Sequence, residues 1–275
     1  MAAAALAGTI YVVGGFHSRG EVTDLLESYD PRSQRWEVRA PLPRRLHHVA
    51  MAALADRLYV VGGFRGEATW RPVATTWEYD PAANRWRRLQ DLPAPRGALA
   101  AAVFRDALYA AGGVTNSSVA TFERFDPRRN SWAQLPPMPT ARDHLALAAA
   151  RGRLYAIGGR RQTFAANLKT VEAFDPVTRT WSEAAPLLAP RSGFAAASLG
   201  ERIYVFGGES PEGTFNTTER YDPTTNTWLR LAAMPTARHG LGAAVVGKRI
   251  VVLGGGPRPG FSFSGIVETF TPPAN

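Results

Sequence analysis

Six glycine pairs, spaced almost evenly along the chain, constrain its fold more than any other feature. Each pair ends a short run of apolar residues that is long enough for one buried strand. The runs with their glycines are residues 10–15, 58–63, 108–113, 154–159, 203–208 and 250–255. From Gly14 to Gly254 the chain advances 240 residues in five steps, a mean period of 48. A fixed period of this length is typical of a repeat architecture.

Other residues recur in register with the glycine pairs. In five repeats an aromatic residue, Asp and Pro follow the pair, and a tryptophan comes six residues after that Asp; the sixth repeat keeps only a degenerate Phe270-Thr-Pro. A glutamate lies two residues before the aromatic residue in every repeat except the second, which has Trp77. One further position lies sixteen residues before the first glycine of the next pair and holds Leu46, Arg96, Arg142, Arg191 and Arg238.

This combined pattern resembles the Kelch repeat, and the resemblance covers essentially the whole chain. It implies an all-β, six-bladed β-propeller in which each repeat forms one four-stranded blade around a central channel. We therefore expect residues 1–275 to form a single Kelch-type propeller domain. The repeats are approximately residues 1–45, 46–95, 96–141, 142–190, 191–237 and 238–275.

Several repeated residues are assigned to the scaffold. The glycines end a strand where the backbone approaches a neighbour closely or takes a positive φ, and the tryptophans are predicted to be buried core anchors. A catalytic pair needs two carboxylates that converge on one bond, whereas a glutamate in nearly every blade is spaced around the ring. The repeated glutamates are therefore predicted to be structural and to pair with the repeat arginines. The scaffold glycines and tryptophans are Gly14, Gly15, Gly62, Gly63, Gly112, Gly113, Gly158, Gly159, Gly207, Gly208, Gly254, Gly255, Trp36, Trp86, Trp132, Trp181 and Trp228.

Closure of the ring departs from the pattern. The last repeat reaches residue 275 after its third predicted strand and before any tryptophan strand, so blade six is expected to have three strands and an exposed edge. The first repeat has only residues 2–6 where the others have a full inner strand. In related propellers a strand from one terminus usually completes a blade begun at the other, and a truncated or misassigned start is the alternative here.

Function in a propeller usually lies on loops at one end of the channel, while the strands form the scaffold. In other Kelch propellers, the residue after the glycine pair and the residue after the arginine tend to line the central pocket. The residue types at these two positions differ from blade to blade in this chain, and this variation is the strongest functional indication in the sequence. After the glycine pairs they hold Phe16, Phe64, Val114, Arg160, Glu209 and Gly256, and after the arginine position His47, Gly97, Asp143, Ser192 and His239.

The longest of these loops has fifteen residues between Gly63 and Tyr79 and contains two tryptophans. Trp77 is expected to pack inside its blade, whereas Trp70 is expected to make a contact, because exposed Trp and Arg are enriched at binding hot spots. Arg160 and His239 are expected to be exposed, so that replacing either leaves stability nearly unchanged. The candidate ligand-binding residues are Phe16, His47, Phe64, Arg65, Trp70, Asp143, Arg160, Ser192, Glu209 and His239.

Arginine supplies almost all of the net charge of +9, since only Lys169 and Lys248 of the 32 basic residues are lysines. Arginine pairs readily with carboxylate and phosphate groups, so one interpretation is an acidic partner. The interpretation that we favour is a solubilising surface, because the arginines are spread through every repeat and form no single run. Nucleic acid is therefore not favoured as a partner, and an anionic ligand is expected at a mildly positive channel mouth.

Metal and cofactor chemistry is not predicted. The chain has no cysteine, which excludes thiolate ligands, a cysteine nucleophile and the cysteine-linked copper site of one related branch of propellers. All five histidines, His17, His47, His48, His144 and His239, lie on the candidate segments. Neighbouring strand residues point to opposite sides, so His47 and His48 are not expected to face the axis together, and no metal site follows.

These observations favour a non-catalytic propeller that recognises a peptide, protein or glycan at the loop face. The alternative is a small-molecule enzyme of the sugar-isomerase type, such as a mutarotase or epimerase, with Arg160, Glu209, Asp143 and a histidine as the acid and base groups. A monomer is expected. No apolar stretch reaches 18 residues and no signal peptide is recognised, so we expect no membrane span and assign the cytoplasm by default.

Overall fold

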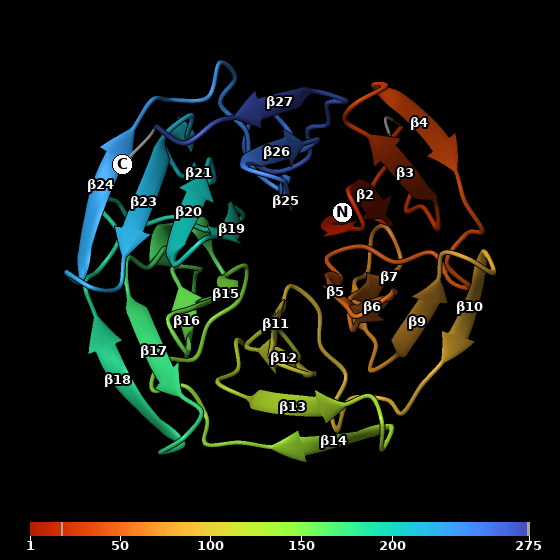
Figure 1. The fold of residues 1–275 in the computed structure, drawn as a ribbon, viewed down its shortest axis with the longest axis horizontal. Helices are drawn as coiled ribbons and strands as arrows, with labels where there is room; N and C mark the ends of the chain where they lie inside the picture. The colour runs from red at the N-terminus through yellow and green to blue at the C-terminus, as the bar shows by residue number, and fades with distance from the viewer. Residues whose placement is uncertain (18, 274–275) are drawn as a thin grey trace.

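Six β-sheets are arranged as blades around a central channel in the computed structural model, which describes residues 1–17 and 19–273 (Figure 1). Five blades have four antiparallel strands, and the sixth has three. The six-bladed, all-β propeller and the incomplete last blade that the repeats predict are therefore confirmed.

The two inner strands of each blade coincide with the apolar parts of the repeats. The innermost strands are β1 (Ala2–Leu6), β5 (Ala50–Leu54), β11 (Ala100–Phe104), β15 (Ala146–Ala150), β19 (Ala195–Leu199) and β25 (Gly242–Val246). The second strands are β2 (Thr9–Val13), β6 (Arg57–Val61), β12 (Ala107–Ala111), β16 (Arg153–Ile157), β20 (Arg202–Phe206) and β26 (Arg249–Leu253). Strand β1 is as long as the other innermost strands, so the expected shortening of the first strand is wrong. Contact between β1 and β25 closes the ring.

The two outer strands carry the aromatic-Asp-Pro and tryptophan segments. The third strands are β3 (Leu26–Asp30), β9 (Thr76–Asp80), β13 (Phe122–Asp126), β17 (Val171–Asp175), β23 (Thr218–Asp222) and β27 (Val267–Phe270). The fourth strands are β4 (Arg35–Val38), β10 (Arg85–Arg88), β14 (Ser131–Gln134), β18 (Thr180–Ala184) and β24 (Thr227–Leu231). The loops add β7 (Phe64–Arg65) with β8 (Arg71–Pro72), β21 (Glu209–Ser210) with β22 (Gly213–Thr214), and the 3₁₀ helix η1 (Phe164–Ala166).

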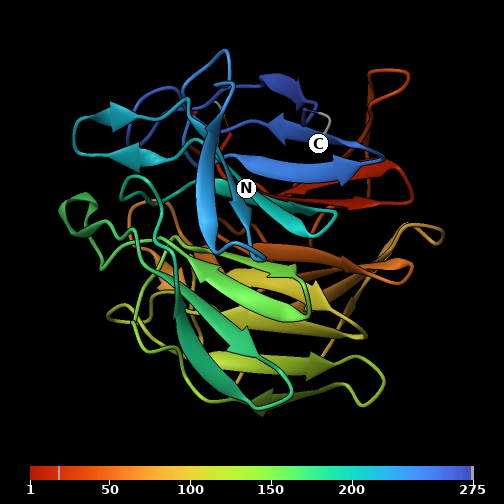
Figure 2. The ribbon, with the colours of Figure 1, turned by 60° about the vertical axis from the view of Figure 1, so that its left-hand side comes forward.

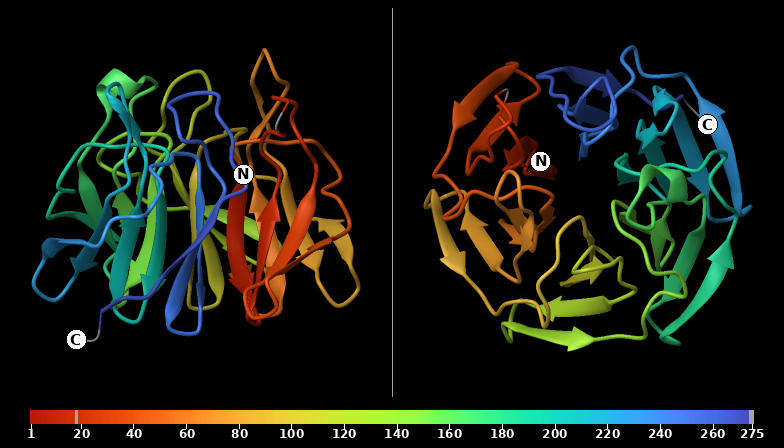
Figure 3. Two further views of the ribbon diagram at one scale, coloured as in Figure 1. Left: turned by 90° about the horizontal axis from the view of Figure 1, so that it is seen from above. Right: turned by 180° about the vertical axis from the view of Figure 1, so that it is seen from behind.

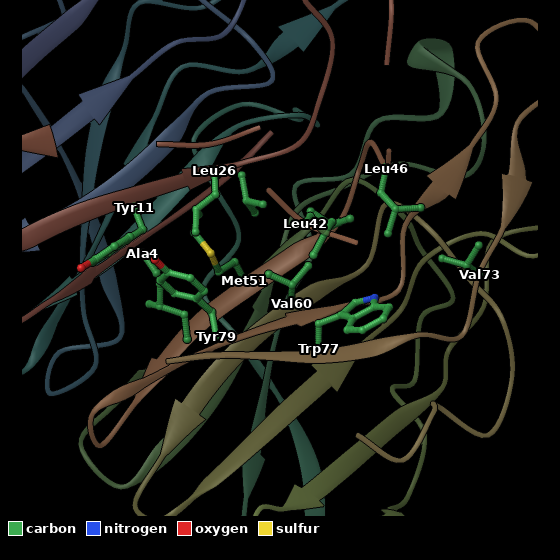
Figure 4. Packing of buried hydrophobic residues seen from close by; sticks show 13 residues of the cluster. Ala4, Tyr11, Leu26, Leu42, Leu46, Met51, Val60, Val73, Trp77 and Tyr79 are labelled. Atoms are coloured by element: carbon green, nitrogen blue, oxygen red, sulfur yellow. The ribbon is translucent and has the colours of Figure 1, made fainter. Parts of the chain in front are cut away.

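The hydrophobic core is divided among the six seams between neighbouring blades. Each cluster of buried apolar side chains combines residues of two adjacent blades. Figure 4 shows the seam between blades one and two, where Tyr11 and Leu26 of one blade pack with Met51 and Val60 of the other. The second strand of each blade is covered on both faces by the neighbouring blades. All five residues of β12 are buried in this way, which explains their continuous apolar sequence.

The glycine pairs allow two blades to meet backbone to backbone. Gly62 has a φ of 61°, and a Cβ added there would lie 2.5 Å from the carbonyl oxygen of Arg96 in the next blade. The N–H of Gly63 donates a hydrogen bond of 2.9 Å to that same oxygen. A side chain at the first position would therefore separate the blades, which is the reason that glycine recurs there.

The repeated arginines and glutamates form buried ion pairs, as the sequence predicts. Four blades contain such a pair: Arg96 with Glu123, Arg142 with Glu172, Arg191 with Glu219, and Arg238 with Glu268. Blade two replaces both partners at once, because Leu46 and Trp77 occupy these positions and lie together in the apolar cluster of the first seam (Figure 4). This paired change is physically reasonable, since a lone buried charge is costly whereas an apolar pair is not.

The repeated tryptophans are not the buried core anchors that the sequence predicts. Trp36 is 41% exposed, and the other four are partly exposed because they lie on the outermost strands. Instead, four of them donate an indole N–H to a backbone carbonyl of the preceding blade: Trp86 to Ala40, Trp132 to Gln90, Trp181 to Pro136 and Trp228 to Ala185. These side chains connect blades at the rim.

Candidate functional site

The two variable positions of each blade lie directly opposite one another at one end of the channel. In five blades the residue after the arginine position forms an antiparallel bridge with the residue after the glycine pair: His47 with Phe64, Gly97 with Val114, Asp143 with Arg160, Ser192 with Glu209, and His239 with Gly256. In the first blade Phe16 instead bridges to Val22. The loops containing β7, β8, β21, β22 and η1 project from this same side, which we call the loop face (Figures 2 and 3).

A cavity of about 780 Å³ opens at the loop face. Five of the ten candidate residues line it: Phe16, Trp70, Arg160, Glu209 and His239. The other five do not line it. His47, Phe64, Asp143 and Ser192 are buried behind the wall, and Arg65 is exposed outside it.

Sequence reasoning missed a position that contributes regularly to the wall. It is the residue directly after the post-arginine position, and in five blades it lines the cavity as His48, Ala98, His144, Gly193 and Gly240. Each of these residues has a φ between 50° and 61°. A left-handed residue interrupts the alternation of a strand, so its side chain does not follow the direction that the sequence pattern indicates.

These left-handed residues are joined from blade to blade by backbone hydrogen bonds around the channel. The N–H of Ala98 donates to the carbonyl of His48 at 2.9 Å, and the N–H of His144 donates to that of Ala98 at 2.9 Å. The series continues from Gly193 to His144 at 3.1 Å and from Gly240 to Gly193 at 2.6 Å. The mouth is thus held by the backbone, which leaves its side chains free to differ.

Only one of the first two histidines faces the cavity, since His48 lines it and His47 is buried behind the wall. Their rings nevertheless meet, because His47 Nδ1 and His48 Nδ1 lie 2.6 Å apart. Burial lowers the pKa of His47 to about 4 and lowers that of His48 well below its usual range. Both rings are therefore neutral at pH 7. Because His47 Nε2 donates to the carbonyl of Gly66 at 3.0 Å, its Nδ1 accepts the hydrogen bond from His48 Nδ1.

Arg160 is the centre of a polar cluster in the wall. Its side chain was expected to be exposed, yet only 7% of the residue is accessible. Its Nε lies 3.4 Å from Asp143 Oδ1, and its Nη1 donates to Glu209 Oε1 at 3.0 Å. The guanidinium carbon also lies 4.5 Å from the ring centre of Phe164 in η1. Two carboxylates from different blades therefore hold this arginine, and it is not available as a free surface cation.

His144 extends this cluster towards the second blade. Arg160 Nη2 lies 3.1 Å from His144 Nε2, and because arginine only donates, Nε2 must accept. The ring proton is then on Nδ1, which donates to Asp143 Oδ1 at 2.6 Å. Burial and the positive charge of Arg160 lower the pKa of His144. Burial would raise the pKa of Asp143, but hydrogen bonds from His144 and Ser118 lower it overall. The pair is a neutral histidine and an ionised aspartate.

Glu209 connects the cluster to the loop of blade six. Its Oε2 accepts a hydrogen bond of 3.2 Å from the N–H of Gly260 and lies 3.5 Å from His239 Nε2. His239 in turn donates from Nδ1 to the carbonyl of Gly256 at 3.1 Å. The polar wall is therefore a continuous network across blades three to six.

Another part of the wall is aromatic and includes two residues that sequence reasoning missed. The ring of Phe16 lies 5.2 Å from Phe261 and 6.2 Å from Phe263, and Trp70 lies 6.3 Å from both Phe16 and Phe261. Phe261 is 64% exposed and Trp70 is 37% exposed. The Phe-Ser-Phe sequence in a Gly- and Pro-rich loop was the available signal for Phe261 and Phe263. An exposed aromatic group beside a polar wall is typical of a binding site.

Neither a metal-binding cluster nor a membrane-spanning helix is found within residues 1–17 and 19–273. In that part of the chain no group of three or more acidic or histidine side chains is arranged to hold a metal ion. The described segments also contain no helix with the length and apolar character needed to cross a membrane.

The fold and the loop-face cavity define a Kelch-type propeller. The sequence matches the KLHDC2/KLHL20/DRC7 Kelch-repeats domain over residues 1–140 and 124–255, and the chain therefore belongs to the Kelch-repeat family. A solved structure described as "Structure of YjhT" has a TM-score of 0.83 over 98% of this chain and 94% of that chain, at 16% sequence identity. This likeness shows the shared fold alone. No curated protein matches the sequence. Kelch propellers generally act as scaffolds for protein interactions.

Proposed function

We propose that this protein is a non-catalytic binding propeller that takes a short part of a peptide, protein or glycan into the cavity at its loop face. The observation that carries the proposal is the division of the cavity into an aromatic wall around Phe16 and a polar wall around Arg160. Pockets of several hundred cubic ångströms with an apolar lining and a few placed polar groups are typical ligand sites. A ring or side chain with one apolar and one polar face is suited to this division.

The charges in the wall favour an uncharged or cationic ligand over the anionic ligand expected from the sequence. Arg160 contacts both Asp143 and Glu209, so one positive charge meets two negative charges. The low pKa values of His48 and His144 leave these rings neutral at pH 7. The excess of arginine over the chain as a whole therefore does not reach this cavity.

Binding to peptide and glycan arrays tests the proposal. We expect ligands selected on the arrays to lose at least about tenfold in affinity with Phe261→Ser, because apolar contacts at a hot spot carry most of the binding energy. Val177→Ser is the matched control, since Val177 is also an exposed apolar residue but lies on a turn at the opposite face. Equal affinity for the two variants would place binding outside the cavity.

A second candidate is acid–base catalysis of sugar isomerisation, which one arrangement favours. His144 is neutral beside an ionised Asp143, and Glu209 lies next to Arg160. A carboxylate and a neutral imidazole in one cavity are suited to remove a proton and return it at another atom. Nuclear magnetic resonance of anomer interconversion in a panel of sugars tests this function. An acceleration that Glu209→Gln abolishes would favour the enzyme, and unchanged rates across the panel would leave the binding role.

A further inference from the structure

Three aromatic rings from the loops of blades one, two and six meet at one place in the cavity wall, which we call the aromatic corner. The ring centres of Phe16 and Phe261 lie 5.2 Å apart at an interplanar angle of 71°, and Trp70 meets Phe261 at 6.3 Å and 70°. Phe16 and Trp70 lie 6.3 Å apart with 36° between their planes. The ring of Phe261 is therefore close to perpendicular to the other two, and all three rings line the cavity.

The faces of aromatic rings attract cations, and this chain uses that attraction elsewhere on its loops. The guanidinium carbon of Arg160 lies 4.5 Å from the ring centre of Phe164, and that of Arg191 lies 4.5 Å from that of Phe215. Within residues 1–17 and 19–273, no arginine or lysine stacks on a ring of the aromatic corner, although the chain has 32 such residues. The described part of the chain thus leaves these ring faces to a ligand.

Glu209 brings a negative charge to the same part of the cavity. Its Oε1 accepts a hydrogen bond from Arg160 Nη1 at 3.0 Å, whereas its Oε2 accepts from the N–H of Gly260 at 3.2 Å, one residue before Phe261. The carboxylate therefore joins the polar cluster to the aromatic loop. Since Asp143 also contacts Arg160 at 3.4 Å, the positive charge of this arginine is already offset, and it opposes a second cation less than a free arginine would.

The two histidines packed on the aromatic corner add no positive charge at pH 7. The ring centre of His47 lies 4.5 Å from that of Phe16, and that of His48 lies 4.7 Å from that of Trp70. Burial lowers the pKa of His47 to about 4 and that of His48 well below its usual range. Both rings therefore extend the aromatic surface without repelling a cation.

We propose that the aromatic corner binds a quaternary ammonium group, carried either by a free choline-like molecule or by a trimethylated lysine side chain. This inference names a ligand class for the binding function proposed above and rests on that function. A quaternary ammonium has no N–H group, so it loses no hydrogen bond when ring faces replace its water. A primary ammonium has three N–H donors that need acceptors, which ring faces supply poorly. The corner therefore favours the methylated form.

A pair of probes that differ only in charge tests the inference. Choline and neohexanol have nearly the same shape, but a carbon atom replaces the charged nitrogen in neohexanol. Both are titrated into the whole protein and followed by ligand-observed nuclear magnetic resonance. We expect saturable binding of choline that is at least about fivefold tighter than that of neohexanol, because only choline gains the attraction to the ring faces. Equal affinities, or no binding of choline, would overturn the inference.

A variant that keeps an apolar side chain separates attraction to the ring from simple apolar contact. Phe261 is 64% exposed, so Phe261→Leu removes the ring with little risk to folding. It should weaken choline at least about fivefold and leave neohexanol nearly unchanged. Phe215→Leu is the matched control, since Phe215 is also an aromatic loop residue but does not line the cavity. An equal loss of choline affinity in the two variants contradicts the inference.

Two short peptides, Gly-Gly-Lys-Gly-Gly with unmodified or trimethylated lysine, identify the source of the ammonium group. Tighter binding of the trimethylated peptide than of choline assigns the site to a modified protein, and the reverse order assigns it to a small molecule. An unmodified peptide that binds as well as the trimethylated one overturns the inference. Array ligands that depend on Phe261 but carry no methylated ammonium would leave the binding function in place and overturn only this ligand class.

Discussion

The seams between blades and the mouth of the channel are built from the same six repeats, yet they use them in opposite ways. In the seams, equivalent positions carry the same side chains or a matched replacement, such as the pair of Leu46 with Trp77 in place of arginine with glutamate. At the mouth, equivalent positions carry unrelated side chains such as Arg160 and Gly256.

The difference follows from what surrounds each layer. Every complete seam presents nearly the same neighbour to each copy, so one packing solution serves repeatedly. At the mouth, backbone hydrogen bonds from His48 to Gly240 join the blades around the channel. The side chains there contribute less to holding the blades together. Seam and mouth should therefore respond differently to substitution.

The largest effect is expected for a broken ion pair in a seam. Arg191→Met leaves the fully buried Glu219 without its partner and should lower the free energy of unfolding by about 3–5 kcal/mol. Urea denaturation followed by tryptophan fluorescence measures the change. The matched control removes both charges, Arg191→Met with Glu219→Leu, and should recover most of the loss. A single variant within about 1 kcal/mol of the parent would contradict a structural role for the pair.

The rim tryptophans should show a smaller effect that depends on the seam. Trp132 is partly exposed, donates to the carbonyl of Gln90 and packs 5.0 Å from Phe125, so Trp132→Ala should cost about 2 kcal/mol, below the value for a fully buried aromatic residue. Trp36 has no such carbonyl partner among the described residues, and Trp36→Ala should cost under about 1 kcal/mol. Equal losses of stability in the two variants would show that the hydrogen bond from Trp132 to the preceding blade contributes nothing.

The histidines at the mouth make stability depend on pH. His47, His48 and His144 have folded pKa values below that of an unfolded histidine. Below pH 6.5 the unfolded chain binds protons that the folded chain does not, so stability is present above this pH and is lost as the pH falls. Between the pKa of the unfolded residue and its own folded pKa, each histidine contributes up to about 1.4 kcal/mol per pH unit.

Chemical denaturation at pH 6 and pH 5 measures this contribution with a matched variant. His48→Asn removes one titrating ring while keeping a residue that tolerates the φ of 51° found there. The variant should lose less stability than the parent between the two pH values. It also isolates His48 from the N-terminal amine, whose pKa burial lowers to about 6. An identical pH dependence in parent and variant would mean that His48 is protonated in the folded protein.

The smallest change in stability is expected at the aromatic wall of the mouth. Phe261→Ser alters an exposed side chain and should leave the free energy of unfolding within about 0.5 kcal/mol of the parent, while it weakens the array ligands. His239→Ala on the polar wall should likewise leave the free energy of unfolding nearly unchanged while it weakens the array ligands. Arg160 is unsuitable for this comparison, because it is buried between two carboxylates. A large loss of stability with Phe261→Ser would show that the loop is part of the scaffold.

The features of this protein that depend on local pattern and repetition were predictable from its sequence. Spacing of the glycine pairs gave the number of blades, and the absence of a tryptophan strand after Phe270 gave the three-stranded blade. The pairing of Arg191 with Glu219 was also predictable, because two positions that recur together in one repeat occupy one place in every blade.

The side chains that reach the cavity, and their protonation states, depend on how the blades fold against one another. The left-handed φ of His48 and His144 reverses the strand alternation from which side-chain direction was predicted. The partners of Arg160 come from its own blade and from the next one, and nothing in a local pattern indicates which charges meet across a seam. Phe16 and Phe261 meet at the mouth although most of the chain lies between them. Local sequence encodes the strands, but the charge and shape of this site arise from contacts through space between blades.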